Sequence, residues 1–387
     1  MEFQKYKLSE IVRLLNGRAY LMPELQDSGK YRILRVGNLS GGNNSWYYSD
    51  MELDEDKYCS KGDLLYAWAC NFGPHFWKEE KVIFHYHIWK LIEDKSKVDR
   101  YYLYYYLLHQ TPFYLGGVNG ATMVHITKQS MEKKTVFIPK SVETQKKIAN
   151  ILYSYDSLIE ANNSRIRLLE KMAENLYKEW LVRNRFPGYK SVIFNGGIPE
   201  GWSYKSLFEV ADVVYGYAFK SERFSDDANK NAVVRIRDIQ DNNTNTFTDE
   251  DCPSKYLIEE NAILIGMDGN FHMCLWNGAR AFLNQRVVKI TSKHEYLCNY
   301  LLLLSIQSQI KFWEQVISGT TVAHLGDKHL KKFRVLIPSS DILRAINIQI
   351  EPIMKEKNRL FNQNKLLVRQ RDLLLPRLMS GKLEVKG

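Results

Sequence analysis

The segment LSEIVRLLNGRAY (residues 8–20) returns as LFEVADVVYGYAF (residues 207–219), at an offset of 199. RVGNL (35–39) likewise matches RIRDI (235–239), and GDLLYAWACNFGPHFW (62–77) matches NAILIGMDGNFHMCLW (261–276). Similarity at one nearly constant offset is the signature of an internal repeat. The chain is therefore predicted to be a tandem duplication, in which Gly17 pairs with Gly216 and Trp77 with Trp276.

A further match closes each repeat, where GATMVHITKQSMEKKTVFIPK (120–140) resembles GTTVAHLGDKHLKKFRVLIPS (319–339). Inside the repeats, short runs rich in Val, Ile, Tyr, Phe and Trp are separated by Gly, Asn and Asp, which is typical of strands and turns. The segments YLYYYLLHQ (102–110) and YLLLLSIQSQIKFW (300–313) predict helices. Each repeat is expected to be an α+β domain.

A helical pattern with alternating spacings of four and three follows each repeat, which predicts a coiled-coil seam. The first seam is Ile148, Leu152, Tyr155, Ile159, Asn162, Ile166, Leu169, Ala173, Leu176 and Trp180. The second seam is weaker and carries charges at two positions: Ile346, Ile350, Ile353, Lys357, Leu360, Asn364, Leu367, Arg371, Leu374 and Leu378. Pro352 is expected to break or kink the early part of the second helix, and Pro376 its end.

An antiparallel pairing that matches Ile148 with Leu378 brings Asn162 opposite Asn364. An amide in an apolar seam is tolerable when a partner hydrogen-bonds it, and such a pair fixes the register of two helices. The alternative is that one or both asparagines face solvent.

The composition indicates a folded protein of two or three domains, with 387 residues, 45% apolar and 25% charged. The N-terminus lacks an apolar core of the signal-peptide type, and no apolar run reaches the length of a membrane span, so we expect a cytoplasmic protein. The five cysteines form no CxxC pair, which argues against disulfides and structural zinc and favours buried free thiols.

The net charge of +10 suggests a polyanionic partner. Segments 1–140, 141–190, 191–340 and 341–387 carry +3, +3, −1 and +5, so most of the positive charge lies on the two helical segments. Any contact of the repeats with nucleic acid must therefore use local patches.

Several motifs, in this order around a duplicated domain, resemble the specificity subunits of type I restriction-modification systems. They are IPKSVETQKKIANIL (138–152), LYKEWLVRNRFPGY (176–189), IPEGW (198–202) and LLLPRLMSGKLEV (373–385). The resemblance covers essentially the whole chain. The first repeat departs from it in lacking an IPxGW-like opening.

The resemblance implies two target-recognition domains separated by two long helices that pack as an antiparallel coiled coil with pseudo-twofold symmetry. The expected boundaries are 1–141 and 191–340 for the recognition domains, and 142–190 and 341–387 for the helices. Each domain would read one half of a split double-stranded DNA target. A helix of about 40 residues spans roughly 60 Å, more than one ~34 Å turn of DNA.

The family also implies partners and cofactors. Two methyltransferase subunits, which methylate adenine, and the restriction subunits, which translocate DNA, would assemble on this chain. S-adenosylmethionine, ATP and Mg would belong to those partners, and no cofactor is expected in this chain.

Sequence motifs of an enzyme are missing. The chain contains no GxxxxGK[ST] loop, no GxGxxG after a strand, no HExxH pair and no Asn/Asp-Pro-Pro-aromatic stretch. Glycine-rich GGNNSW (41–46) and GGVNGATM (116–123) fit neither nucleotide fingerprint and are interpreted as loops, and His85 and His87 as strand residues. We therefore expect a non-catalytic protein.

Phosphates attract Lys and Arg, whereas Arg, Lys, Asn, Gln and Thr read base edges. Segments 71–81 and 119–128, with their counterparts 270–280 and 320–328, hold most of the candidates for DNA contact. These are Arg35, Asn71, His75, Lys78, Lys81, Asn119, Thr122, Lys128, Arg235, Arg237, Asn270, His272, Arg280, Thr320, Thr321 and Lys328.

Residues that recur in both repeats, such as His125 and His324 or Trp77 and Trp276, are better explained as shared scaffold, because the two domains should read different sequences. Unmatched positions between them should carry the sequence code. Two rival hypotheses remain open: a scaffold of the same fold that reads no DNA, and a methyltransferase or nuclease in its own right.

Overall fold

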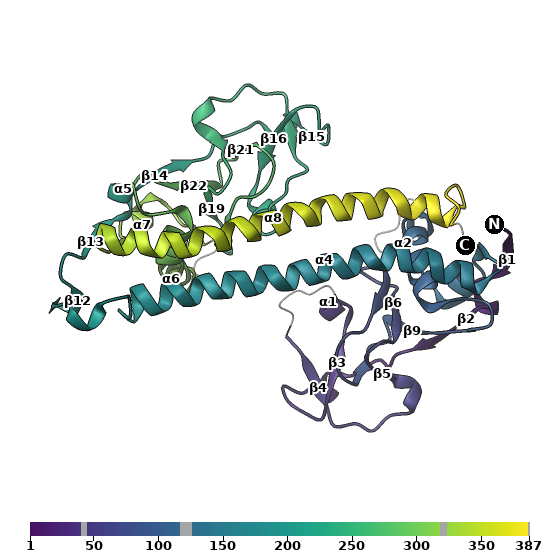
Figure 1. Ribbon diagram of the computed structural model, residues 1–387. Helices are drawn as coiled ribbons and strands as arrows, with labels where there is room; N and C mark the ends of the chain where they lie inside the picture. Colours follow the sequence, from purple (N-terminus) through teal and green to yellow (C-terminus); the bar gives the residue numbers. More distant parts are fainter. Residues whose placement is uncertain (40–44, 117–125, 318–322, 386–387) are drawn as a thin grey trace. The chain divides into compact units, whose positions relative to one another are not determined.

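The computed structural model describes residues 1–387 except 40–44, 117–125, 318–322 and 386–387 (Figure 1). The chain divides into two compact units. The first unit combines Met1–Ala161 with Asn364–Gly387, and the second is Asn162–Gln363. Each unit thus contains one repeat together with part of each long helix.

The first unit is built on two four-stranded sheets and a two-stranded ribbon. The antiparallel sheet has the order β2 (Val12–Asn16), β9 (Ile88–Glu93), β6 (Leu64–Ala67) and β7 (Gly73–Phe76). The other sheet has the order β4 (Tyr47–Ser49), β3 (Tyr31–Leu34), β8 (Val82–Phe84) and β5 (Tyr58–Cys59), and the ribbon pairs β1 (Phe3–Lys7) with β10 (Thr135–Pro139).

The second unit repeats this topology. Its antiparallel sheet has the order β14 (Ala211–Tyr215), β22 (Val287–Ser292), β19 (Ile263–Gly266) and β20 (Met273–Leu275). The other sheet has the order β15 (Phe224–Ser225), β17 (Phe247–Thr248), β16 (Asn231–Val234), β21 (Ala281–Leu283) and β18 (Leu257–Ile258). Ribbons pair β13 (Ser203–Ser206) with β23 (Arg334–Ile337), and β11 (Phe194–Asn195) with β12 (Ile198–Pro199).

The strand registers confirm the duplication. Leu64 pairs with Leu91 in the first unit, and Ile263 pairs with Ile290 in the second. Both residues of the second pair are 199 positions after those of the first. β3 pairs with β8 in parallel, and β16 pairs with β21 in parallel at the equivalent place. Two helices predicted from the sequence are also present, as α2 (Arg100–Leu115) and α6 (Asn299–Ile317).

The remaining helices are short. They are the α-helices α1 (Val36–Leu39), α3 (Lys128–Glu132), α5 (Leu207–Val210) and α7 (Asp327–Leu330), and the 3-10 turns Leu8–Glu10, Met22–Glu24, Glu55–Lys57, Tyr189–Ser191, Ser221–Arg223, Ile236–Asp238 and Ser254–Tyr256.

The two long helices are α4 (Val142–Tyr177), extended by a π-helical turn over Lys178–Val182, and α8 (Ser340–Met379). The central helix, predicted to reach residue 190, therefore ends earlier. Asn184 adopts a left-handed φ of 55°, and Pro187 follows, which cannot continue a helix.

The predicted break at Pro352 is wrong, because α8 is helical throughout its length. Pro352 and Pro376 are both exposed, as are Ile348 and Asp372, the residues whose carbonyl groups lose a hydrogen-bond donor. Water can satisfy those carbonyls, so the proline costs less there than in a buried position.

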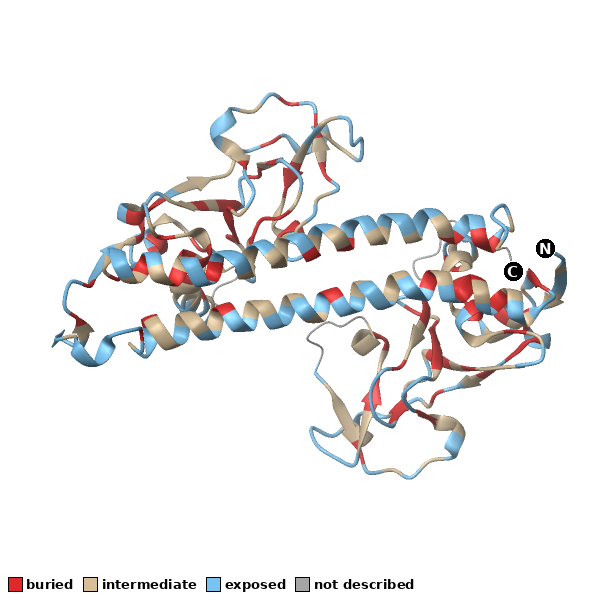
Figure 2. Cartoon of the chain, in the orientation of Figure 1, coloured by how far each residue is buried: buried red, intermediate tan, exposed pale blue. Residues whose placement is uncertain are grey.

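Within each unit, α4 and α8 run side by side in opposite directions (Figure 1). Ile148, Leu152 and Leu378 are completely buried in one core cluster of the first unit. The two charges of the second seam have partners on α4: Arg371 Nη1 lies 2.6 Å from Asp156 Oδ1, and Lys357 Nζ lies 2.8 Å from Glu170 Oε1. Figure 2 shows buried residues gathered on the sheets and on one side of the long helices.

Candidate nucleic-acid interface

The predicted cations of the first unit are held by neighbouring side chains. The Arg35 guanidinium lies 4.3 Å from the ring centre of Tyr47 and donates to the Ser45 carbonyl at 3.0 Å. Lys81 lies over Tyr58 at 4.1 Å and forms an ion pair with Glu55 at 3.0 Å. These contacts position both cations at the sheet formed by β4, β3, β8 and β5 and at the segments that connect its strands.

Other predicted residues of the first unit lie around β7 and α3. Asn71 is exposed in the turn before β7, and the half-buried His75 lies within β7. Burial lowers the pKa of His75, so its ring is neutral at pH 7. Lys78 forms an ion pair with Glu160 of α4 at 2.8 Å, and Lys128 begins α3.

In the second unit, Arg235 lies 5.4 Å from the ring centre of Phe224, and Arg237 donates to Thr246 Oγ1 at 3.1 Å. His272 Nδ1 lies 3.1 Å from Gln240 Nε2. The other three predicted residues are exposed: Asn270, Arg280 and Lys328.

Four predicted residues lie outside the described residues: Asn119, Thr122, Thr320 and Thr321. His125 lies there too. DNA contact by each of the sixteen candidates stays a prediction.

Two residues that recur in both repeats, Trp77 and Trp276, have structural roles. Trp77 and Trp276 are buried, and each indole donates to a carbonyl three residues ahead, that of Glu80 at 2.7 Å and of Ala279 at 2.9 Å. A Cβ on Gly17 would lie 2.4 Å from the His85 carbonyl oxygen. These positions match the prediction of a shared scaffold.

Two turns that pass these glycines were not predicted from the sequence. Residues 85–87 connect β8 to β9, and residues 284–286 connect β21 to β22. His85 and His87 thus lie in a turn and not within a strand as expected. The sequence does contain one indication of these turns. Residues 85–87 (His-Tyr-His) and 284–286 (Asn-Gln-Arg) differ at every position, although the segments beside them match between the repeats.

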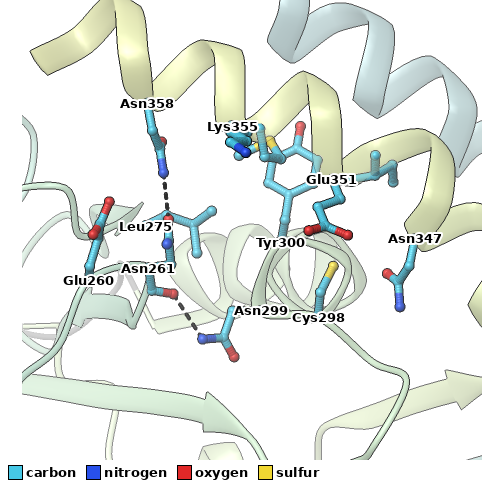
Figure 3. Close-up of a pocket in the computed structure, with 12 residues that line it drawn as sticks. Glu260, Asn261, Leu275, Cys298, Asn299, Tyr300, Asn347, Glu351, Lys355 and Asn358 are labelled. Atoms are coloured by element: carbon cyan, nitrogen blue, oxygen red, sulfur yellow. Dashed lines mark hydrogen bonds between the residues drawn. The ribbon is translucent and has the colours of Figure 1, made fainter.

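A groove of about 600 Å³ lies between α8 and the start of α6 in the second unit (Figure 3). Asn358 Nδ2 donates to Asn261 Oδ1 at 3.0 Å, and Asn299 Nδ2 donates to the Asn261 carbonyl at 2.9 Å. In the first unit, Arg100 Nη1 donates to the carbonyl of Gly62, the counterpart of Asn261, at 3.1 Å. In both repeats, the first residue of the helix, Arg100 of α2 or Asn299 of α6, thus donates a hydrogen bond to the carbonyl of the same turn position.

The two asparagines of the predicted seam are both buried, with exposed fractions of 1% for Asn162 and 9% for Asn364. Neither therefore faces solvent. Asn162 Nδ2 donates to Gln363 Oε1 at 3.2 Å. Asn162 and Asn364 belong to different units, and their pairing stays a prediction.

The cysteines are free thiols. Burial raises the pKa of the Cys59 thiol, which keeps it protonated. Cys70 is exposed, so the prediction of buried thiols is wrong for this residue. Among the residues that the structure describes, no three His, Cys, Asp or Glu side chains gather where they could hold a metal ion. Nor does any described helix combine the length and apolar character needed to cross a membrane.

The family described as "Type I restriction modification DNA specificity domain" matches residues 1–171 and 199–367, more than half of the chain. The chain belongs to this family. It is a type I restriction-modification specificity subunit with two tandem recognition domains. The two matched ranges each contain one repeat, so the duplication seen in the strand registers is a duplication of the recognition domain.

Named relatives agree with this assignment. The type I restriction enzyme EcoBI specificity subunit of Escherichia coli is 27% identical over 190 residues, which are 48% of this chain and 40% of that protein. The MjaVIII specificity subunit of Methanocaldococcus jannaschii is 23% identical over 413 residues, covering 100% of this chain and 94% of the relative.

The fold is shared with the crystal structure of a type I restriction-modification S subunit from M. genitalium. The TM-score is 0.58 at 16% sequence identity, with 97% of this chain and 96% of that chain covered. The α+β recognition domains and long helices of this specificity subunit are therefore those of a known fold.

Proposed function

We propose that this specificity subunit reads a split duplex DNA target, with one half-site for each recognition domain. The observation that carries the proposal is the pair of units with the same strand registers and different side chains at equivalent turns. Two copies of one scaffold with different surfaces are suited to two different DNA sequences, because phosphate contacts position a protein and base-edge contacts specify the sequence.

We further propose that the chain is not itself catalytic. It would dock two methyltransferase subunits and the restriction subunits, which would bring S-adenosylmethionine, ATP and Mg. The long helices are the proposed docking elements, since exposed Leu168 on α4 and Leu366 on α8 offer apolar side chains at equivalent positions of the two helices. Exposed apolar side chains on helices are suited to partner helices.

The test is a footprint on DNA with the complex assembled from this chain and its methyltransferase subunits. We expect two protected segments separated by a fixed gap, and an affinity for the target at least 1,000-fold above that for unrelated DNA. Binding that is indifferent to sequence and abolished by modest salt would favour the rival scaffold hypothesis. Methyl transfer by the purified chain alone would contradict the non-catalytic assignment.

A further inference from the structure

The two turns at residues 85–87 and 284–286 have the same main-chain framework. Each is closed by a hydrogen bond from the residue after the turn to the first turn carbonyl, and each accepts a bond at its third carbonyl from the end of a neighbouring strand. In the first unit these are Ile88 N to His85 O at 3.0 Å and Trp68 N to His87 O at 3.1 Å; in the second they are Val287 N to Asn284 O at 2.9 Å and Met267 N to Arg286 O at 3.0 Å.

The main chain of a glycine lies against each turn and donates a hydrogen bond to the residue that follows it. Gly17 N donates to the Ile88 carbonyl at 3.3 Å, and Gly216 N donates to the Val287 carbonyl at 3.1 Å. A Cβ on Gly216 would lie 1.9 Å from the Asn284 carbonyl oxygen, so only glycine fits there. The framework is thus carried by main-chain atoms and glycine.

Those side chains differ completely between the units. The first turn is His-Tyr-His and the second is Asn-Gln-Arg, and the adjacent Trp68 is replaced by Met267. Positions needed for the fold, such as Trp77 and Trp276, are the same in both repeats. A turn with a constant main chain and variable polar or aromatic side chains is a structure suited to reading different ligands.

In the second unit, the Asp268 carboxylate contacts two basic side chains beside the turn. Arg286 Nε lies 3.3 Å from Asp268 Oδ2, and His324 Nδ1 lies 2.6 Å from Asp268 Oδ1. The Arg286 side chain is 56% exposed. Asp268 contacts Nε of this half-exposed side chain, and an arginine can make a bidentate contact with guanine O6 and N7.

In the first unit, the equivalent place is aromatic. Trp68, Tyr86 and Trp89 line a cavity of about 310 Å³ together with Asn16 and Lys128. The Trp68 and Trp89 rings stack with centroids 5.8 Å apart. Apolar surfaces contact the thymine methyl group in the major groove.

We infer that these two turns are base-reading elements, each for its own half-site, and that Arg286 reads a guanine while the Trp68 and Tyr86 surface contacts a thymine methyl group. The inference rests on the proposed function and assigns the specificity-determining residues within it.

The experiment uses the complex of the full chain with its methyltransferase subunits, and maps methylated sites in a library of DNA targets. Arg286→Gln should reduce the preference for guanine at one position of one half-site about 10-fold or more, the range of a bidentate contact. The other half-site should be unchanged. Arg223→Ala is the matched control, because Arg223 is also an exposed arginine in an ion pair, with Asp249, and its motif should be that of the wild type.

A second variant replaces residues 85–87 with those of the other turn, H85N/Y86Q/H87R, and should change only the half-site read by the first domain. Its folding is checked by retained methylation of some target. If both folded variants methylate the wild-type motif, the inference is overturned while the proposed function stands. If the wild-type complex itself methylates no bipartite motif, that result contradicts the proposed function and, with it, the inference that rests on it.

Discussion

Gly216 lies where β14 ends beside the turn at Asn284 and donates to the Val287 carbonyl at 3.1 Å. Gly216→Ala should lower the free energy of unfolding of the second unit by about 3 kcal/mol, because the new Cβ forces two main-chain segments apart. Urea denaturation measures the change. Gly116→Ala is the control, since its Cβ would meet the Pro112 carbonyl only at 3.4 Å. Equal stability of the two variants would contradict the argument.

His85 provides a pH test. Burial lowers its pKa to about 4, with smaller contributions from His87 and Arg35. An unfolded histidine has a pKa of about 6.5, so between these two values the unfolded chain binds more protons than the folded one. The contribution of His85 to stability is therefore complete above pH ~6.5 and is lost as the pH falls toward ~4.

His85→Asn, which places the residue of the second repeat at this position, should flatten the pH dependence of unfolding of the first unit over that window, by on the order of 2 kcal/mol. Urea denaturation at pH 7 and at pH 4.5 would detect it. A variant with the wild-type slope would show that His85 is protonated in the folded state.

Asp156 on α4 connects three helices of the first unit, α2, α4 and α8. It accepts a hydrogen bond from the Tyr105 hydroxyl of α2 at 2.6 Å and pairs with Arg371 of α8. Arg371→Met should lower the free energy of unfolding by about 1–2 kcal/mol, because Asp156 loses its half-buried cationic partner.

The control for this change is Arg344→Met, since Arg344 is more exposed and pairs with Asp341 only one helical turn away. It should cost less than ~0.5 kcal/mol. A double-mutant cycle of Arg371→Met with Asp156→Asn isolates the pair, and a coupling energy near zero would show that the contact contributes only packing.

The two units differ in chain continuity. The second unit is one continuous segment, whereas the first needs residues from both ends of the chain. Leu375, Leu378 and Met379 of α8 belong to the core cluster that contains Leu8 and Tyr102.

Truncation after residue 363 should therefore destabilise the first unit selectively. Hydrogen exchange of amides should become faster across residues 1–161 and remain slow in the strands of the second unit, because the second core is left complete. Equal protection of both units after truncation would mean that the C-terminal segment contributes little to the first core.

Much of the fold could be predicted from the sequence, because a duplication leaves the same residues at a fixed offset, and a seam leaves apolar residues at spacings of three and four. The prediction failed where solvent changed the cost of a residue. Pro352 does not end α8, since the carbonyl that loses its donor belongs to the exposed Ile348. The charges at Lys357 and Arg371 seemed to weaken the seam, and the carboxylates of Glu170 and Asp156 explain them.

The two equivalent domains and two long helices of this specificity subunit were predictable from the amino-acid sequence, because repeat and heptad patterns are local or periodic properties of the chain. Which unmatched residues lie together depends on the folded domain. Arg286, Asp268 and His324 are distant in sequence. They meet because β19 pairs with β22 beside Asp268 and Arg286, and because an isolated bridge joins Asp268 to His324. Side-chain identity alone does not specify such a meeting, since it depends on the path of the main chain through the whole domain.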